Sequence, residues 1–433
     1  MRILHTSDWH LGQNFFSKSR KSEHQAFIGW LLQQVGEHNV DAVLIAGDVF
    51  DTGTPPSYAR ELYHSFIVEM SRLNCQLLIL GGNHDSVSTL NETKGLLAYL
   101  DTQVIAGVSE DPATQIVTLK NREGEPGAIV CAIPFIRPRD VLSSQAGESI
   151  RAKQQALGDA IQAHYHQLHQ LAIEEQKRHD QPIPIIATGH LTALGVKLSE
   201  SVRDIYVGSL EAFPAQAFPP VDYIALGHIH RPQIVAKSKH IRYSGSPIPL
   251  SFDELKTQKS VFLADFADGA LKQVTPLLIP RFQAMQVLKG NLSAIEEQLN
   301  ISYPQNSVDN SKVSTNDSGK TAGNVDNPDI STNDSNKPAI TWLSIEVETN
   351  DYLTDLQQRI QSLCEGLPVD ILQLRRARAD RRAGIEQVEQ ETLNELSVED
   401  IFERRLALET FEGQEAEQRR DRIRQLYSGI VSE

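Results

Sequence analysis

Aspartate, asparagine and histidine gather in five short motifs that lie far apart in the sequence. Their side chains offer carboxylate, amide and imidazole ligands without sulfur, a set that suits Mn²⁺, Fe²⁺ or Zn²⁺ better than Ca²⁺ or Mg²⁺. The set exceeds what one ion needs and fits two ions that share a bridging carboxylate, the usual arrangement for phosphoester hydrolysis. The motifs are D-x-H at Asp8 and His10, G-D-x-x-D at Asp48 and Asp51, G-N-H-D at Asn83, His84 and Asp85, G-H at His190, and G-H-x-H at His228 and His230.

The spacing inside the motifs indicates a shared site. Alternate side chains of a strand lie on one face, so Asp8 and His10 can point to one ion, and His228 and His230 can do the same. Glycine directly precedes four of the motifs' residues and permits sharp turns there. A single D-x-H is common by chance, whereas five motifs that each follow a predicted strand indicate a metal centre.

Short apolar runs precede these motifs and predict the strands that position them. Helices are expected between the first strands, over residues 23–38 and 56–73, and this alternation is typical of βαβ units in an α/β fold. Open α/β sheets bind their ligands beyond the carboxyl ends of the strands, where the motifs lie. The predicted strands are Arg2–Thr6, Ala42–Ala46, Leu77–Leu80, Ile183–Thr188 and Tyr223–Leu226.

Residues 143–180 predict a long polar helix that carries four histidines: His164, His166, His169 and His179. Histidine-rich stretches can bind metal, but no carboxylate or cysteine completes a ligand set at fixed spacing here. We therefore expect a solvated helix face, with metal binding as the alternative.

The chain changes character after residue 280. Residues 302–338 are nearly all Ser, Thr, Asn, Asp, Gly, Pro and Lys, which predicts a disordered insertion. Apolar patterns on both sides of it predict one small α+β domain, over 281–301 and 339–376. Its expected strands are Phe282–Leu288, Ile340–Val347 and Val369–Leu374, and its expected helices are Leu292–Leu299 and Leu353–Cys364.

The last part of the chain, residues 377–433, is charged and predicted to be helical. Ser397 and Asp400 start one amphipathic helix, and a second carries Ile423 to Ile430. Such helices pack either on their own domain or in a groove of another protein. A basic run precedes them and either contacts phosphates or is a solvated linker: Arg375, Arg376, Arg378, Arg381 and Arg382.

Composition limits the classes of protein that need consideration. The 433 residues carry 41 basic and 56 acidic side chains, a formal net charge of −15 that argues against a nucleic-acid binder. The three cysteines are too few and too separated for a disulfide framework or a cysteine-rich zinc module. No run approaches the roughly 20 apolar residues of a membrane span, and no signal peptide is evident. We expect a cytoplasmic protein of two or three domains with no membrane association.

The five motifs together resemble the calcineurin-like metallophosphoesterase superfamily. Within it, the segments MRILHTSDWHLGQ, AGDVFDTGTPPSYAREL, GGNHDS, GHIHRPQ and YSGSPIPLSF are similar to the SbcD-like family of bacterial nuclease subunits. The resemblance is close over residues 1–280 and looser beyond. It implies an α/β fold with a β-sandwich flanked by helices in a nuclease domain over 1–280, followed by the small α+β domain as a DNA-capping domain and C-terminal helices.

The resemblance also implies a role for each motif residue. One metal would be held by Asp8, His10, Asp48 and His230, and Asp48 would bridge to the second. His84 matches the catalytic histidine, Asp51 would orient His84 or a water, and Asp85 would support the ligands. Manganese is the ion most often used by relatives. The second metal would be held by Asp48, Asn83, His190 and His228.

The same resemblance overrides the argument from net charge. It implies a DNA nuclease that acts as a 3′-to-5′ exonuclease on duplexes and an endonuclease on hairpins or single strands, in DNA repair, recombination and replication. It further implies an SbcC-like coiled-coil ATPase of the SMC type as partner, gripped by the terminal helices, and a homodimer. The alternatives are a phosphoesterase for small substrates, which would not need the residues after 280, and a scaffold protein without catalysis, which the intact motifs argue against.

Overall fold

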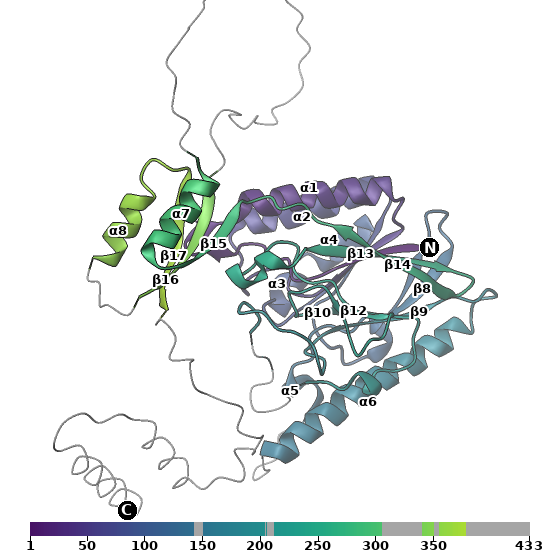
Figure 1. Cartoon of the computed structure of the whole chain (residues 1–433). Coiled ribbons are helices and arrows are strands. Elements are labelled where there is room, and N and C mark those ends of the chain that lie inside the picture. The colour runs from purple at the N-terminus through teal and green to yellow at the C-terminus, as the bar shows by residue number, and fades with distance from the viewer. Residues whose placement is uncertain (143–149, 204, 206–211, 305–339, 350–354, 378–433) are drawn as a thin grey trace, which may run out of the picture. The chain divides into compact units, whose positions relative to one another are not determined.

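Two six-stranded sheets form the larger part of the protein (Figure 1). A computed structural model describes residues 1–142, 150–203, 205, 212–304, 340–349 and 355–377. In the first sheet, β1, β4, β5 and β6 run parallel, and β13 and β14 add an antiparallel edge beside β1. Its spatial order is β14 (Ala270–Leu278), β13 (Ser260–Ala267), β1 (Arg2–Thr6), β4 (Ala42–Ala46), β5 (Gln76–Leu80) and β6 (Thr102–Ile105).

The second sheet is built in the same way from the middle of the chain. Strands β8, β9, β10 and β12 are parallel, while β7 and β11 pair antiparallel at the two edges. Its order is β11 (Gln233–Ile234), β12 (Ile241–Tyr243), β10 (Tyr223–Gly227), β9 (Ile185–His190), β8 (Pro126–Cys131) and β7 (Ile116–Lys120).

An apolar layer joins the two sheets face to face. Ile3, Leu44 and Leu80 of the first sheet belong to one buried cluster with Val130 and Ala225 of the second. Strand β4 is buried along its whole length because its other face is also covered, which explains its uninterrupted apolar sequence. This arrangement confirms the predicted β-sandwich.

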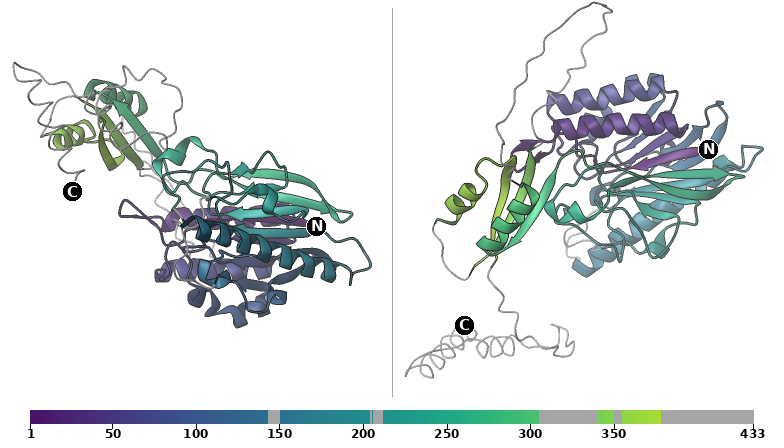
Figure 2. Two further views of the ribbon diagram at one scale, coloured as in Figure 1. Left: turned by 90° about the horizontal axis from the view of Figure 1, so that it is seen from below. Right: turned by 45° about the horizontal axis from the view of Figure 1, so that its top comes forward.

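Helices cover the two outer faces of the sandwich (Figure 2). On the first sheet lie α1 (Lys21–Glu37) and α2 (Ser57–Arg72), and Phe27, Leu31 and Phe66 belong to the cluster buried there. The second sheet is covered by α6 (Ile150–Gln176). The predicted helices over 23–38 and 56–73 are therefore confirmed. Their apolar residues recur at helical spacing, and this spacing places them on the side that faces the sheet.

Helix α6 corrects one prediction made from its polarity. His164 and His169 are buried rather than solvated, because they flank the core residues Tyr165 and Leu168 on the side of the helix that faces the second sheet. Burial lowers the pKa of both imidazoles. Neither belongs to a cluster with metal-ligand geometry among the described residues, while residues 143–149 of the predicted helix lie outside them.

Shorter elements connect these layers. A hairpin of β2 (Asn14–Phe15) and β3 (Lys18–Ser19) follows β1. The short α-helices are α3 (Val87–Asn91), α4 (Lys94–Leu97) and α5 (Pro138–Val141), and the 3₁₀ helices are η1 (Ala98–Leu100), η2 (Pro112–Gln115), η3 (Ala215–Ala217) and η4 (Phe252–Lys256). Within the described residues, no helix is long and apolar enough to cross a membrane.

The predicted small α+β region contains a third sheet of three parallel strands. Leu288, Leu343 and Ile345 of this sheet pack with Ile295 and Ile360 of its two helices in a separate core. All five predicted elements are present: β15 (Met285–Gly290), α7 (Leu292–Ser302), β16 (Thr341–Glu348), α8 (Leu356–Leu363) and β17 (Val369–Ala377).

Two boundaries in this region differ from expectation. Helix α7 continues through Ser302, so the polar insertion begins later than predicted; residues 305–339 lie outside the described part of the chain. Arg375 and Arg376 belong to β17 instead of following the last strand. The remaining arginines of the basic run and both predicted C-terminal helices fall within residues 378–433, which are also outside the described part.

Candidate metal centre

The five motifs meet at one edge of the sandwich, beyond the carboxyl ends of parallel strands from both sheets. Asp8 and His10 follow β1, Asp48 follows β4, and Asn83 follows β5. From the second sheet, His190 is the last residue of β9 and the G-H-x-H motif follows β10. Residues up to 220 positions apart thereby come into contact, since the backbone N–H of His228 donates to Asp8 Oδ1 over 2.8 Å.

The way in which these side chains converge differs from the prediction. Strand alternation does not align Asp8 with His10, because β1 ends at Thr6 and both residues lie in the loop beyond it. They have left-handed backbones, with φ of 54° and 48°, as do Asp48 at 51° and His228 at 92°. Left-handed backbone is unfavourable for residues other than glycine and is concentrated at functional sites. Loops beyond the strands therefore orient these four ligands, whereas His190 is the last residue of β9.

Three overlapping clusters have the geometry of metal sites. In each, one ligand atom per residue lies within 4.8 Å of the others. Asp48 belongs to two of the clusters and His10 to two, so the clusters form one continuous centre. The clusters are Asp8 with His10 and His230, His10 with Asp48 and His84, and Asp48 with His190 and His228.

Asn83 completes the last of these clusters. Its Oδ1 lies 2.9 Å from His190 Nε2 and 3.1 Å from His228 Nδ1. His190 Nε2 is in turn 3.2 Å from Asp48 Oδ2. One amide oxygen, one carboxylate oxygen and two imidazole nitrogens therefore converge, a donor set that fits a divalent ion of the first transition row.

The charges at the centre also fit cations. Asp8 and Asp48 are buried, and within the described residues neither forms an ion pair with lysine or arginine. Buried carboxylates are usually paired or coordinate metals. Burial would raise the pKa of Asp48, but His190 and His10 hold it well below its usual range. Burial would likewise lower the pKa of His190, yet the carboxylate of Asp48 raises it to about 9.

The ring nitrogens of the histidines give a second sign of a metal centre. Within the part of the chain that the structure describes, Nε2 of His10 and Nε2 of His228 are buried without a hydrogen-bond partner. The Nδ1 of His10 contacts Asp51 Oδ1 over 3.1 Å, so Nε2 is the nitrogen left for an ion. His190 is held in a similar way, since its Nδ1 donates to the carbonyl of Ala46 over 2.9 Å. Metal-binding histidines commonly use their second nitrogen in this manner.

His84 lies at the rim of the centre and is only partly buried. Its Nδ1 donates to the backbone carbonyl of Asp51 over 2.7 Å, while its backbone N–H donates to Asp48 Oδ1 over 2.9 Å. The ring centroid is 4.6 Å from that of His10. Burial lowers the pKa of His84, although Asp48 opposes this effect. Asp51 thus contacts His84 through its backbone carbonyl and His10 through its carboxylate.

Asp85 ties together the two loops that carry Asp48 and Asn83. Its carboxylate accepts from the backbone N–H groups of Val49 at 3.1 Å, Phe50 at 2.9 Å and Gly82 at 2.9 Å. Burial, together with nearby Asp48, raises its pKa to about 6. These contacts link the backbone after Asp48 to the backbone before Asn83, while the role of Asp85 toward the ligands stays a prediction.

Sequence reasoning missed one part of the site. His230 Nδ1 contacts the hydroxyl of Ser201 over 2.6 Å, and Ser201 also contacts the buried carboxylate of Glu254. Neither residue belongs to a motif, and the sequence carries no signal that links them to His230. Their proximity arises only when the loop after β9 and the helix η4 fold over the end of β10.

Comparison with known proteins agrees with this geometry. The calcineurin-like phosphoesterase family matches residues 1–232, and the family described as "Type 5 capsule protein repressor C-terminal domain" matches residues 281–410. Since the first match spans more than half of the chain, the protein belongs to the calcineurin-like phosphoesterase family.

Individual relatives narrow this class. The chain is 49% identical over 428 residues to the D subunit of the nuclease SbcCD from Escherichia coli strain K12, covering 99% of this chain and 97% of that protein. It is 35% identical over 289 residues to the protein of the same name from Rhodobacter capsulatus, covering 65% and 70% of the two chains. The Bacillus subtilis protein of this name is 32% identical over 274 residues, covering 62% and 67%. The chain is thus a phosphodiester hydrolase of the nuclease class, and its family implies divalent metals.

Proposed function

We propose that the centre holds two divalent ions, most suitably Mn²⁺, for hydrolysis of DNA phosphodiesters. The observation that carries the proposal is the continuity of the three clusters, which His10 and Asp48 join, with Asp48 in the middle cluster as the candidate bridging carboxylate. The first ion would be held by Asp8, His10, Asp48 and His230. The second ion would be held by Asp48, Asn83, His190 and His228.

The chain's own residues have separate tasks in this reaction. Two ions held by these residues would supply a lowered water pKa and positive charge for the phosphoryl oxygens. His84 Nδ1 is committed to the carbonyl of Asp51, so Nε2 is the nitrogen available to hydrogen-bond the leaving oxygen. We assign the imidazolium form of His84, in which Nε2 also carries a proton, as the proton donor to that oxygen; Asp48 favours this charged form, and Asp51 fixes the ring.

The proposed substrate is DNA, cut as a 3′-to-5′ exonuclease on duplexes and as an endonuclease on hairpins or single strands. Similarity over nearly the whole chain to a nuclease component supports this substrate. The corresponding roles are DNA repair, recombination and replication in the cytoplasm. The Escherichia coli relative is one component of the SbcCD nuclease, which supports an SbcC-like coiled-coil ATPase as the partner of this chain.

We propose a matching division of the chain. Residues 1–280 form the nuclease domain, 281–301 with 339–376 form the DNA-capping domain, 302–338 are an insertion, and 377–433 bind the ATPase. Arg375 of the capping domain is about half exposed and pairs with Glu200 over 3.6 Å. We propose that this arginine exchanges its carboxylate partner for a DNA phosphate when DNA binds.

A homodimer is the proposed form of this protein. Support comes from α4 and η1, where Leu96 is 66% and Tyr99 is 88% exposed. Large apolar side chains that lie this close together on a surface often mark an interface between proteins. A second copy of the same surface would bury both side chains in a two-fold contact.

One experiment tests the catalytic assignment. The full chain with Mn²⁺ and the ATPase partner should cleave a labelled hairpin duplex, and EDTA should abolish cleavage. His84→Gln should keep both ions, because His84 is not assigned as a ligand, and should lose about 10²–10⁴-fold in turnover, the usual contribution of a general acid. His166→Gln, at an exposed site on α6, is the matched control and should retain full turnover.

Two outcomes would contradict the proposal. Undiminished cleavage by His84→Gln with both ions bound would remove His84 from the mechanism. Hydrolysis of a small phosphodiester together with inert DNA would replace DNA by a small substrate.

A further inference from the structure

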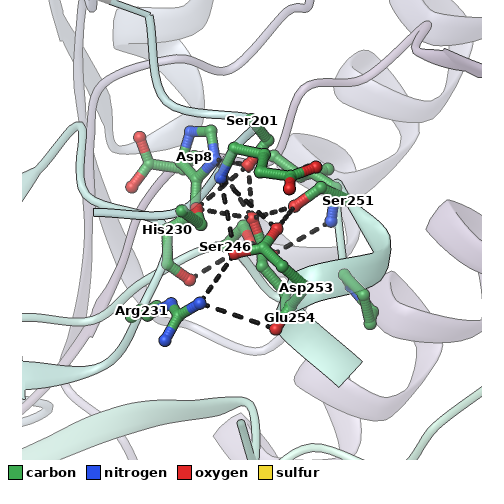
Figure 3. A network of polar contacts seen from close by, with 12 residues as sticks. Asp8, Ser201, His230, Arg231, Ser246, Ser251, Asp253 and Glu254 are labelled. Carbon is green, nitrogen blue, oxygen red and sulfur yellow. Dashed lines mark hydrogen bonds and ion pairs between the residues drawn. The ribbon is translucent and has the colours of Figure 1, made fainter. Parts of the chain in front are cut away.

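A buried polar network contacts His230 (Figure 3). At its centre is Glu254 of η4, whose side chain is completely buried. Oε1 accepts hydrogen bonds from Ser199 at 2.8 Å, from Ser201 and from Ser251 at 3.2 Å. Such a concentration of hydroxyl donors on one buried carboxylate oxygen requires an explanation.

The other carboxylate oxygen of Glu254 balances the charge. Oε2 accepts from Lys259 Nζ at 2.6 Å and from the backbone N–H of Leu250 at 3.1 Å. Glu254 is a carboxylate, because it forms an ion pair with Lys259 and both of its oxygens accept hydrogen bonds. Buried charges persist only when they are paired and hydrogen-bonded, as this pair is.

A hydrogen-bond relay leads from this carboxylate to His230. Ser201 Oγ lies 2.6 Å from His230 Nδ1 and also contacts Glu254 Oε1. The carboxylate can only accept, and the hydroxyl has one proton to give. Ser201 therefore donates to Glu254 and accepts from Nδ1–H of His230. This fixes the tautomer of His230 in which Nε2 carries the lone pair.

The backbone of His230 is held by the same network. Lys259 Nζ donates to the carbonyl of His230 over 2.8 Å, and the backbone N–H of Ser246 donates to that carbonyl over 3.2 Å. Ring and main chain of this residue are thus fixed from one side by Glu254 and its counterion. His230 also forms a cluster with Asp8 and His10, and Nε2 is the ring nitrogen that the network leaves for an ion there.

From this geometry we infer that Ser201 and Glu254 are positioning residues for His230, and that Lys259 maintains them by neutralising Glu254. The inference rests on the proposed role of His230 as a metal ligand. With these partners, His230 resembles two other expected ligands in using its Nδ1 for a hydrogen bond within the protein. His10 Nδ1 contacts Asp51, and His190 Nδ1 contacts the carbonyl of Ala46. Outer partners of metal-binding histidines set ring orientation and basicity.

A purely structural role is the competing explanation. The network also joins Ser246, Leu250 and Ser251, so it could serve only to fold the segment before η4. The two roles differ in what Ser201 does. Removing its hydroxyl breaks the relay to His230, whereas removing the hydroxyl of Ser199 takes one donor from the same oxygen and one 3.1 Å neighbour from Ser201 Oγ, but leaves the contact between Ser201 and His230 in place.

The test compares Ser201→Ala with Ser199→Ala in the full chain. Each protein is stripped with EDTA, desalted and titrated with Mn²⁺, with free Mn²⁺ followed by electron paramagnetic resonance. Wild type should bind two ions per chain. Ser201→Ala should weaken one of the two sites by about 10–100-fold, the usual effect of losing an outer partner, and leave the other site unchanged.

The controls separate positioning from folding. Ser199→Ala should bind both ions within about 2-fold of wild type, and Ser201→Thr, which keeps the hydroxyl, should restore most of the lost affinity. His230→Ala should weaken the same site as Ser201→Ala. Glu254→Gln should shift that site in the same direction, and urea unfolding of each variant reports whether its fold is intact.

The outcomes distinguish this inference from the proposed function. Two tight ions in wild type with Ser201→Ala behaving like Ser199→Ala would overturn the relay and leave the metal centre standing. Equal weakening of both sites by Ser201→Ala, together with lower stability, would reduce the network to a structural role. Absence of Mn²⁺ binding by wild type would overturn the proposed function and the inference with it.

Discussion

Replacement of Gly82 by alanine should disable the metal centre through a single added methyl group. Gly82 lies between β5 and Asn83, where its backbone passes directly beneath Asp48. A Cβ atom at this position would lie 2.1 Å from Asp48 Oδ1 and 2.3 Å from the backbone nitrogen of Asp48. Its backbone does not have a positive φ, so alanine is excluded by contact and not by conformation.

The size of the effect follows from these distances. Atoms in van der Waals contact stay about 3.5–4 Å apart, so Asp48 or the loop of Gly82 must move by more than about 1 Å. Misplacement of a reacting group by about 1 Å can cost on the order of 10²-fold in turnover. Because a backbone atom is among the obstacles, rotation of the Asp48 side chain alone cannot relieve the clash. Overpacking of this kind costs roughly 1–3 kcal/mol of folding free energy.

Gly29→Ala is the matched control. Gly29 lies inside α1, and a Cβ there would meet nothing within 4 Å. It should raise the free energy of unfolding by about 0.5–1 kcal/mol, because alanine favours a helix over glycine. Mn²⁺ titration, DNA cleavage and urea unfolding would be measured on both variants. Wild-type ion affinity and turnover in Gly82→Ala would refute the assignment of Asp48 as the shared ligand.

Two further predictions concern stability. His5 is buried, with Nδ1 3.0 Å from the hydroxyl of Tyr223 and Nε2 3.2 Å from the carbonyl of Leu226, and burial lowers its pKa to about 3. Below about pH 6.5, His5 therefore binds a proton in the unfolded chain but stays neutral in the folded protein. The free energy of unfolding should consequently fall by about 2 kcal/mol by pH 5. His5→Gln should flatten this part of the curve in urea titrations at several pH values, and an unchanged slope would contradict the argument. Arg20→Lys should lower the free energy of unfolding by about 3–5 kcal/mol in urea titrations. Arg20 is buried and pairs through two nitrogens with Glu23, and the single ammonium group of lysine cannot form this two-point contact. A decrease below about 1 kcal/mol would contradict the argument.

The sequence was sufficient to predict that the residues of the five motifs lie close together. Each motif follows an apolar run that predicts a strand, and parallel strands end at the same edge of a sheet. The positions of the motifs directly after the strands therefore predicted that their side chains meet at that edge. The clusters around Asp48 confirm the convergence of the motifs, although which ion each residue holds stays a prediction.

How the side chains are aimed could not be predicted in the same way. Alternation along a strand was applied to Asp8 and His10, but β1 ends before them and both have left-handed backbones. No local pattern distinguishes an aspartate in that conformation from one in a strand. Only the contacts of each loop with its neighbours stabilise it.

Long-range burial was equally hidden from sequence reasoning. His164 and His169 were expected in solvent because their helix is polar, yet they face the second sheet beside Tyr165. Nothing in the local sequence distinguishes Glu254 from a solvent-exposed acidic residue of a short helix. Its burial depends on Ser201 and Lys259, which come from other segments. In each case the environment of a polar side chain is set by elements distant in the chain, which periodicity does not report.

The left-handed backbones of four expected ligands explain why the loops that carry them depend on one another for stability. A left-handed backbone costs a non-glycine residue roughly 1–2 kcal/mol, and four expected ligands adopt it. The loops offset this cost by bonding to each other. The N–H of Asp8 donates to the carbonyl of Gly47 at 3.0 Å, that of His10 to the carbonyl of Asp48 at 3.1 Å, and that of His228 to Asp8 Oδ1 at 2.8 Å. Because each loop supplies the acceptor that holds the next, the ligands are arranged by the protein itself, and disturbance of one loop must propagate to ligands on the other sheet.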